Sequence, residues 1–220
     1  MQSKLFTATL WLGLVVFQGC SGNEDAAADT KADTSHTQAP DHSNLTTHNM
    51  NNDLMNAMNS SMEKMKSMKM TGEFEHDFAM MMIEHHQGAV NMCQVEVSKG
   101  SDATIKEMAN KMMGRQKSEI STLQNFIRDH KPTDARSDGH NHLHDEMQKM
   151  EAKMNGIKMT GNLDKDFAMM MIPHHESAIK MAEDEITHGK NLNLKRMAQN
   201  MMDDQRNEIT ELQVWLDKNK

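Results

Sequence analysis

The chain contains no tyrosine, and aromatic residues make up only 4% of its 220 positions. Aromatic residues are enriched in β-strands, so their scarcity favours a helical fold with few strands. Basic residues are also too few to balance the acidic ones, and the formal net charge is -8. Phosphate binding requires a basic surface, which excludes a nucleic-acid partner. Cations are better matched to this charge.

Residues 1–20 have the features of an export signal. Lys4 supplies a positive charge, and the apolar run that follows is too short to span a bilayer. Gly19 and Cys20 end the segment and resemble a bacterial lipoprotein cleavage box. We expect export to the cell envelope with a lipid on Cys20, and ordinary signal cleavage is the alternative. A lipidated Cys20 would leave Cys93 as the only thiol, so no internal disulfide could form.

Residues 21–50 are rich in Ala, Asp, Thr, Ser and Asn and contain almost no large apolar side chains. Such a segment cannot build a core, and its composition predicts a disordered tether. The tether contains His36, His42 and His48, which either capture metal transiently or belong to a polar spacer.

The most informative feature is an internal repeat with an offset of 89 residues. The segment Met70-Thr-Gly-Glu-Phe-Glu-His-Asp-Phe-Ala-Met-Met-Met-Ile returns as Met159-Thr-Gly-Asn-Leu-Asp-Lys-Asp-Phe-Ala-Met-Met-Met-Ile. Ten pairs among the 26 methionines lie one offset apart. The duplication predicts two helical copies, residues 51–131 and 142–220, joined by a His-containing linker over 132–141.

Each copy is expected to form a short helix and a long helical hairpin, because apolar residues recur at spacings of three and four. The expected helices are 52–69, 74–98 and 102–130 in the first copy, and 142–156, 163–188 and 191–218 in the second. Gly100 and Gly189 fall at the hairpin turns, and Pro132 and Gly139 bracket the linker. Two hairpins supply four long amphipathic helices, so an all-α, ferritin-like bundle is predicted.

Methionine and histidine gather in stripes on the hairpin helices, since successive residues on a helix are separated by about 100°. In the first copy the two stripes are Met81, His85 and Met92 beside Met82, His86 and Cys93. In the second copy they are Met170, His174 and Met181 beside Met171, His175 and Ala182. The second hairpin helix adds sulfur at Met108 and Met112, repeated as Met197 and Met201, on the side that holds Gln116 and Gln205.

These residue types indicate copper. Thioether sulfur suits Cu(I) and imidazole binds Cu(I) or Cu(II), whereas magnesium or calcium demands oxygen ligands. Silver is the chemical alternative. The competing interpretation is that the methionines only form the core, as stripes at helical spacing commonly do. The histidine pair in both copies favours ligation by at least one member of each, and adjacent residues diverge too far to share one ion.

Three local features bear on this site. Pro173 replaces Glu84 inside the helical pattern and is expected to kink the helix beside the histidine pair. Asp77 and Asp166 open the first hairpin helices, where capping or dipole neutralisation is a better expectation than ligation. The segment His140-Asn-His-Leu-His144 is either an accessory copper site or a hydrophilic linker.

The repeated Asp-Phe-Ala-Met-Met-Met-Ile-x-His-His motif resembles the hallmark of the bacterial family called domain of unknown function 305, over roughly residues 50–220 in two copies. The resemblance implies a ferritin-like helical fold and copper binding, since one member is a periplasmic copper-binding protein associated with copper resistance. It carries ligand roles onto Met81, Met82, His85, His86, Met112, Met113, Met170, Met171, His174, His175, Met201 and Met202. Glu84 stands where the motif has proline.

Two other classes of function remain open. A ferritin-like bundle can hold two iron ions through Glu-x-x-His motifs on two helices, which would make the protein a metal-dependent oxidoreductase. Such motifs run from Glu73 to His76 and from Glu185 to His188, but neither occurs in both copies, so no enzyme is expected. The second class is a metal-free helical protein whose methionine surface binds partner proteins.

The function expected from the sequence is sequestration or buffering of copper in the cell envelope, or resistance to it. Its partners would be metal ions and other envelope proteins that handle copper. The membrane would be reached only through the lipid on Cys20.

Overall fold

The computed structural model of the protein describes residues 43–132 and 139–220. The expected signal segment, Cys20 and the tether as far as residue 42 lie outside the described residues. The described part of the chain contains no strand and is made of six helices: α1 Ser43–Ser67, α2 Phe74–Lys99, α3 Ala103–Asp129, α4 Gly139–Asn155, α5 Leu163–His188 and α6 Leu192–Lys218. The predicted all-α fold of two repeated units is confirmed.

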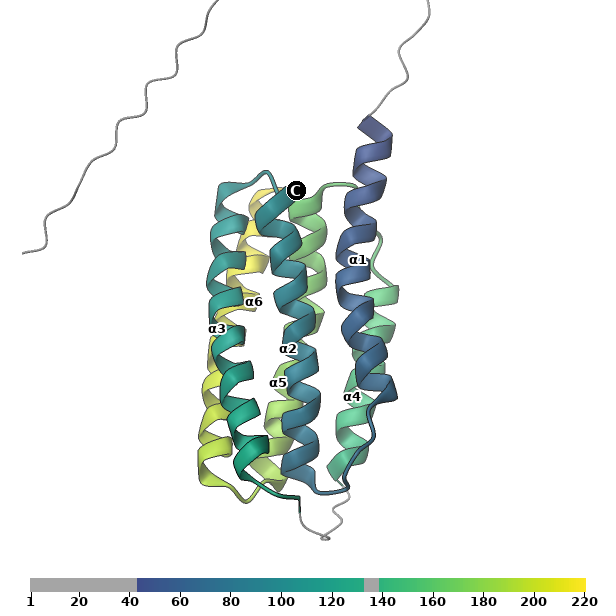
Figure 1. The fold of residues 1–220 in the computed structure, drawn as a ribbon. Coiled ribbons are helices and arrows are strands. Elements are labelled where there is room, and N and C mark those ends of the chain that lie inside the picture. The colour runs from purple at the N-terminus through teal and green to yellow at the C-terminus, as the bar shows by residue number, and fades with distance from the viewer. Residues whose placement is uncertain (1–42, 133–138) are drawn as a thin grey trace, which may run out of the picture. The chain divides into compact units, whose positions relative to one another are not determined.

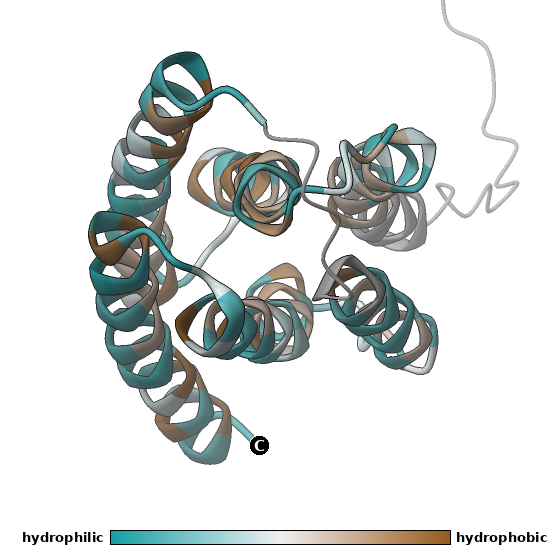
Figure 2. Ribbon diagram, turned by 90° about the horizontal axis from the view of Figure 1, so that it is seen from below, coloured by the Kyte–Doolittle hydropathy of each residue, from teal (hydrophilic) through white to brown (hydrophobic). Residues whose placement is uncertain are grey.

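The helices of residues 43–220 form a bundle with α2 and α5 at its middle (Figures 1 and 2). Helix α2 packs against α5, against α3 on one side and against α1 on the other. Helix α5 packs in the same way between α6 and α4. The two helices that carry the histidine motif are therefore the ones most enclosed by the rest of the bundle.

The observed bounds of the four hairpin helices agree with the predicted ranges to within one residue at each end. Helix α1, however, begins at Ser43, inside the segment predicted as tether, and α4 begins at Gly139, inside the predicted linker. Among the side chains of α1 that the structure describes, from residue 53 onward, Leu54 is the first buried apolar one. The polar residues before it carry no apolar periodicity, which explains why the sequence pattern did not predict a helix there.

The loop that precedes α2 has the same structure as the loop that precedes α5. Gly72 and Gly161 have φ angles of 87° and 85°, a region that glycine occupies without steric cost. Asp77 accepts hydrogen bonds from the backbone N–H groups of Thr71 and Gly72 at 2.7 and 2.9 Å. Asp166 holds its own loop in the same way, at 2.7 and 3.1 Å. The two aspartates therefore have a structural role, as expected.

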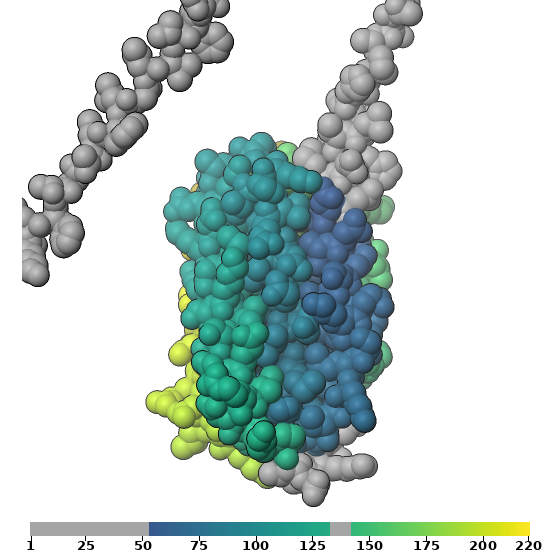
Figure 3. Space-filling model, in the orientation of Figure 1, coloured from purple at the N-terminus to yellow at the C-terminus, as the bar shows by residue number. Residues whose placement is uncertain are grey.

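Methionine supplies a large part of the core. Most of the buried methionines lie on α1, α2, α4 and α5: Met58, Met62, Met65, Met81, Met82, Met92, Met147, Met150, Met154, Met170, Met171 and Met181. Helices α3 and α6 contribute Met112, Met201 and Met202. The face drawn in Figure 3 is covered by side chains of α1, α2 and α3.

Helix α5 continues through Pro173 as one unbroken helix. Among the described helices, none is both long and apolar enough to cross a bilayer.

Candidate metal centre

One histidine from each repeat meets its counterpart between α2 and α5. The ring centroids of His85 and His174 are 3.8 Å apart, and the ring planes are inclined by 41°. The Nε2 atom of His174 lies 3.1 Å from the backbone carbonyl oxygen of His85. Both side chains are buried. The two copies of the histidine motif therefore contribute to a single place in the bundle.

Both of these imidazoles are held in the neutral form. Burial lowers the pKa of His85 well below its ordinary value, and the neighbouring histidines His86 and His175 lower it further. Burial also lowers the pKa of His174, with His85 as the next cause. Both ring nitrogens of His85, and Nδ1 of His174, lack a hydrogen-bond partner among the described residues. A neutral imidazole with an unshared lone pair is the form that binds a metal ion.

The second histidine of each motif faces a different helix. His86 Nε2 lies 2.7 Å from a carboxylate oxygen of Glu119 on α3, and His175 Nε2 lies 2.8 Å from one of Glu208 on α6. The centroids of the adjacent rings are separated by 6.2 Å in the first repeat and 6.1 Å in the second. The divergence expected for adjacent helical residues is therefore present, and each outer histidine lies in close contact with a carboxylate.

The two glutamates were missed in the sequence, although a signal for them exists. Glu119 and Glu208 are one repeat offset apart. Glu119 also follows the buried Gln116 by three residues and precedes the buried Leu123 by four, so it lies on the inward side of its helix. A charged residue on such a face, kept in both copies, could have been assigned to the histidine on the neighbouring helix.

The methionines predicted as ligands fall into two groups. Nine are buried: Met81, Met82, Met92, Met112, Met170, Met171, Met181, Met201 and Met202. Three are only partly buried and pack against the edge of the core: Met108, Met113 and Met197. Spacing by four residues places Met81 on the helix face of His85, and Met170 on that of His174. Burial alone is compatible with both core packing and ligation, so the ligand roles of these methionines stay predictions.

A further methionine approaches the histidine pair from α1. A Cβ atom at Gly88 would lie 3.5 Å from both the sulfur of Met58 and Nε2 of His174. The missing side chain at Gly88 thus lets a thioether and an imidazole from two other helices come close to the same point. Cys93, on the same helix, is fully buried, and burial raises the pKa of its thiol, which stays protonated.

Two other groups of residues were singled out in the sequence, the buried glutamines and the histidine cluster at the start of α4. Gln116 and Gln205 are buried, and both amide atoms of Gln116 lack a partner among the described residues. Of the predicted His140–His144 cluster, His142 is exposed and its ring centroid lies 5.7 Å from that of His188 at the end of α5.

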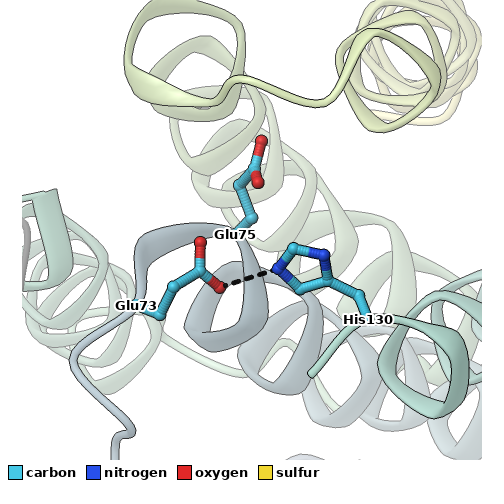
Figure 4. Close-up of side chains that lie close together, drawn as sticks. All are labelled: Glu73, Glu75 and His130. Carbon is cyan, nitrogen blue, oxygen red and sulfur yellow. Dashed lines mark hydrogen bonds and ion pairs between the residues drawn. The ribbon is translucent and has the colours of Figure 1, made fainter. Parts of the chain in front are cut away.

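A separate polar group lies at one end of the bundle, where α2 begins and α3 ends. Glu73, Glu75 and His130 each place one possible ligand atom within 4.8 Å of the other two (Figure 4). His130 Nε2 lies 3.3 Å from Glu73 Oε2. Glu75 extends toward the turn between α5 and α6, where it accepts hydrogen bonds from the backbone N–H groups of Lys190 and Asn191. This group was not predicted from the sequence.

Fold and site together define an all-α protein in which two copies of one helical unit enclose a buried histidine centre. The chain belongs to the family described as Domain of unknown function (DUF305), whose model matches residues 24–127 and 128–216. The family membership predicted from the histidine motif is confirmed.

Two solved structures share this fold. CopM in the Cu(II)-bound form is 21% identical in sequence, with a TM-score of 0.52, and the match covers 66% of this chain and 97% of that chain. A DUF305 fragment from Deinococcus radiodurans is 18% identical, with a TM-score of 0.50 and coverage of 66% and 96%. At these identities the likeness concerns the fold alone. No curated protein matches the chain.

Proposed function

We propose that this protein binds copper ions through its paired histidines and the adjoining methionines, and that it is a binding protein and not an enzyme. The observation that carries the proposal is the contact between His85 and His174, one from each repeat, 3.8 Å apart as neutral rings in a methionine-rich interior. A protein that only needed a packed core would not require unpartnered ring nitrogens there, because buried polar atoms without partners destabilise the fold.

The chemistry of the donors selects the metal. Imidazole and thioether are both available without losing a proton, and together they suit Cu(I), with silver as a close substitute. Glu119 and Glu208 lie against the rings of the outer histidines, and carboxylates beside histidine ligands commonly orient them around bound metals. The fold shared with CopM, which was solved with Cu(II) bound, supports the same assignment.

The biological role that fits is sequestration, buffering or resistance in the cell envelope. The expected export signal places the chain outside the cytoplasm, and the lipid on Cys20 would hold it at a membrane. Copper held in a dry interior is kept away from thiols and amines of neighbouring proteins. Other envelope proteins that handle copper would then be the donors or acceptors of the ion.

The decisive experiment measures Cu(I) affinity of the purified chain by competition with a chromophoric chelator. In the test variant His85→Gln/His174→Gln both inner rings are removed while a polar side chain remains. The matched control is His188→Gln, which alters an exposed histidine outside both histidine motifs. We expect affinity to fall at least about 100-fold in the test variant and to be unchanged in the control, since a lost ligand costs more than a lost outer partner.

A buried histidine change can also disturb folding, so a second variant keeps the core intact. Met81→Leu/Met170→Leu removes two sulfurs with little change in volume, a substitution that cores tolerate well. Weaker Cu(I) binding with an unchanged melting temperature of the metal-free protein would support thioether ligation. Absence of Cu(I) binding in the parent, together with no rise in its melting temperature on adding Cu(I), would contradict the proposal and favour the metal-free interaction protein.

A further inference from the structure

The end of the bundle where α2 begins and α3 ends, here called the first end, gathers more carboxylates than the fold requires. Glu73 caps α2 by accepting the His76 backbone N–H at 2.9 Å. Glu75 caps the α5–α6 turn with one oxygen. These bonds explain why each side chain is held still. They leave open why an imidazole, His130, is placed 3.3 Å from Glu73 within the same group.

A fourth side chain, Glu185, is buried beside this group. It is fully inaccessible to solvent, and neither carboxyl oxygen has a hydrogen-bond partner among the described residues. Burial and, next, the charges of the nearby Glu75 and Glu73 raise its pKa to about 8, against the opposing effect of Lys195. A buried carboxyl group without a partner is costly, and a bound cation is one way in which such a group becomes satisfied.

The opposite end of the bundle, the second end, is an internal comparison. The repeat offset maps Glu73, Glu75, His130 and Glu185 onto Asn162, Asp164, Asn219 and Glu96. Glu96 is also fully buried, beside Asp164, and Asp164 also caps a turn of the other repeat. The buried glutamate and the capping carboxylate are thus common to both ends. At the other two aligned positions the first end has a carboxylate and an imidazole, and the second end has two neutral amides.

We infer that Glu73, Glu75 and His130, with the buried Glu185 beside them, form a second metal site, for a divalent first-row transition ion such as Zn²⁺, distinct from the copper centre. Two carboxylates with one imidazole match the oxygen and nitrogen ligands that zinc accepts. Calcium is disfavoured because it takes six to eight oxygen ligands, and Cu(I) because no thioether belongs to the set. The ligands come from the start of α2 and the end of α3, and Glu75 also holds the turn between α5 and α6, so the ion would lie where the two repeats meet.

The test uses the whole chain, stripped of metal by a chelator and titrated with Zn²⁺ in a calorimeter, and with Co²⁺ as a visible-absorption probe. The variant Glu73→Asn/His130→Asn gives the first end the residues of the second. It preserves the helix cap, because Asn162 accepts the Lys165 N–H at 2.9 Å. Loss of a residue that only orients a metal ligand costs roughly 10- to 100-fold in affinity. Because Glu73 and His130 would be direct ligands, we expect the affinity for Zn²⁺ at one site to fall by more than that.

Two further variants locate the ion. Glu185→Gln is expected to weaken Zn²⁺ binding, whereas the matched Glu96→Gln at the second end leaves it unchanged. His85→Gln/His174→Gln is expected to abolish Cu(I) binding and keep this Zn²⁺ site, which separates failure of the second site from failure of the copper proposal. The inference is overturned if the parent binds no Zn²⁺, if Glu73→Asn/His130→Asn binds it equally well, or if the Co²⁺ bands disappear only in the His85→Gln/His174→Gln variant.

Discussion

The two ends of the bundle are copies of one sequence pattern, and they differ at three of the four aligned positions compared above. At both ends a carboxylate reaches the other repeat and accepts hydrogen bonds from two backbone N–H groups in the turn between that repeat's hairpin helices. This crossing carboxylate is Glu75 at the first end and Asp164 at the second. At both ends a buried glutamate stands beside it. The remaining two positions are Glu73 and His130 at the first end, and Asn162 and Asn219 at the second.

Some side chains at the two ends are needed by the fold, and at other positions the fold tolerates different residues. The crossing carboxylate is retained because backbone N–H groups at helix starts must find acceptors. The buried glutamate beside it is retained as well, at both ends. The other two positions accept either a neutral amide or a metal-binding side chain, since both kinds cap a helix. Ligand chemistry can therefore be added at one end without cost to the shared architecture.

The largest effect is expected when a crossing carboxylate is removed. Asp164→Ala deletes the acceptor for the backbone N–H groups of Ser101 and Asp102, both at 2.9 Å. Because hydrogen bonds to charged groups contribute about 1.5–3 kcal/mol each, we expect the free energy of unfolding to drop by about 3 kcal/mol. Glu75→Ala should have a similar effect at the first end. Urea denaturation measures both, and a loss below about 1 kcal/mol would show that solvent replaces these caps.

A smaller loss is expected from adding a methyl group at the turns. A Cβ atom at Gly100 would lie 2.0 Å from Glu96 Oε1 and 2.6 Å from its carbonyl oxygen, and one at Gly189 would lie 2.1 and 2.6 Å from the same atoms of Glu185. Either substitution by alanine should cost about 1–3 kcal/mol through overpacking. The control is Gly114→Ala, where no atom lies within 4 Å, and it should raise helix stability by about 1 kcal/mol.

The third prediction concerns pH at the second end. Burial, and next the neighbouring Asp164, raise the pKa of Glu96 from 4.5 to about 8. Between these pH values the folded protein keeps a proton that the unfolded chain releases, so stability declines as pH rises, by no more than about 1.4 kcal/mol per pH unit. Glu96→Gln should abolish this part of the decline. Thermal denaturation from pH 5 to pH 8 checks it, and parallel curves for variant and parent would contradict the assigned protonation.

Much of the fold could be predicted from the sequence, because it depends on local patterns. Apolar periodicity gave the hairpin helices, and Gly100 and Gly189 marked the turns, where each caps its helix by donating to the carbonyl four residues earlier. The start of α1 was wrong, since polar residues before Leu54 carry no periodic signal.

The candidate sites were harder to predict because their members are distant in the chain. The contact between His85 and His174 spans one whole offset, and no local spacing indicates whether equivalent residues meet or hold separate sites. Glu73 was set aside because its counterpart is Asn162. That test of symmetry is suitable for a site repeated in both copies, and it necessarily rejects a site that exists once.

The crossing of Glu75 and Asp164 has a consequence for how such chains originate. Each carboxylate serves a turn of the opposite repeat, so a lone copy would leave its own turn without an acceptor and would pair with an identical chain to obtain one. In such a homodimer every mutation would appear twice, once at each end. With both copies in one chain, a substitution at one end leaves the other unchanged, so the two ends can carry different side chains, as they do at Glu73 and Asn162.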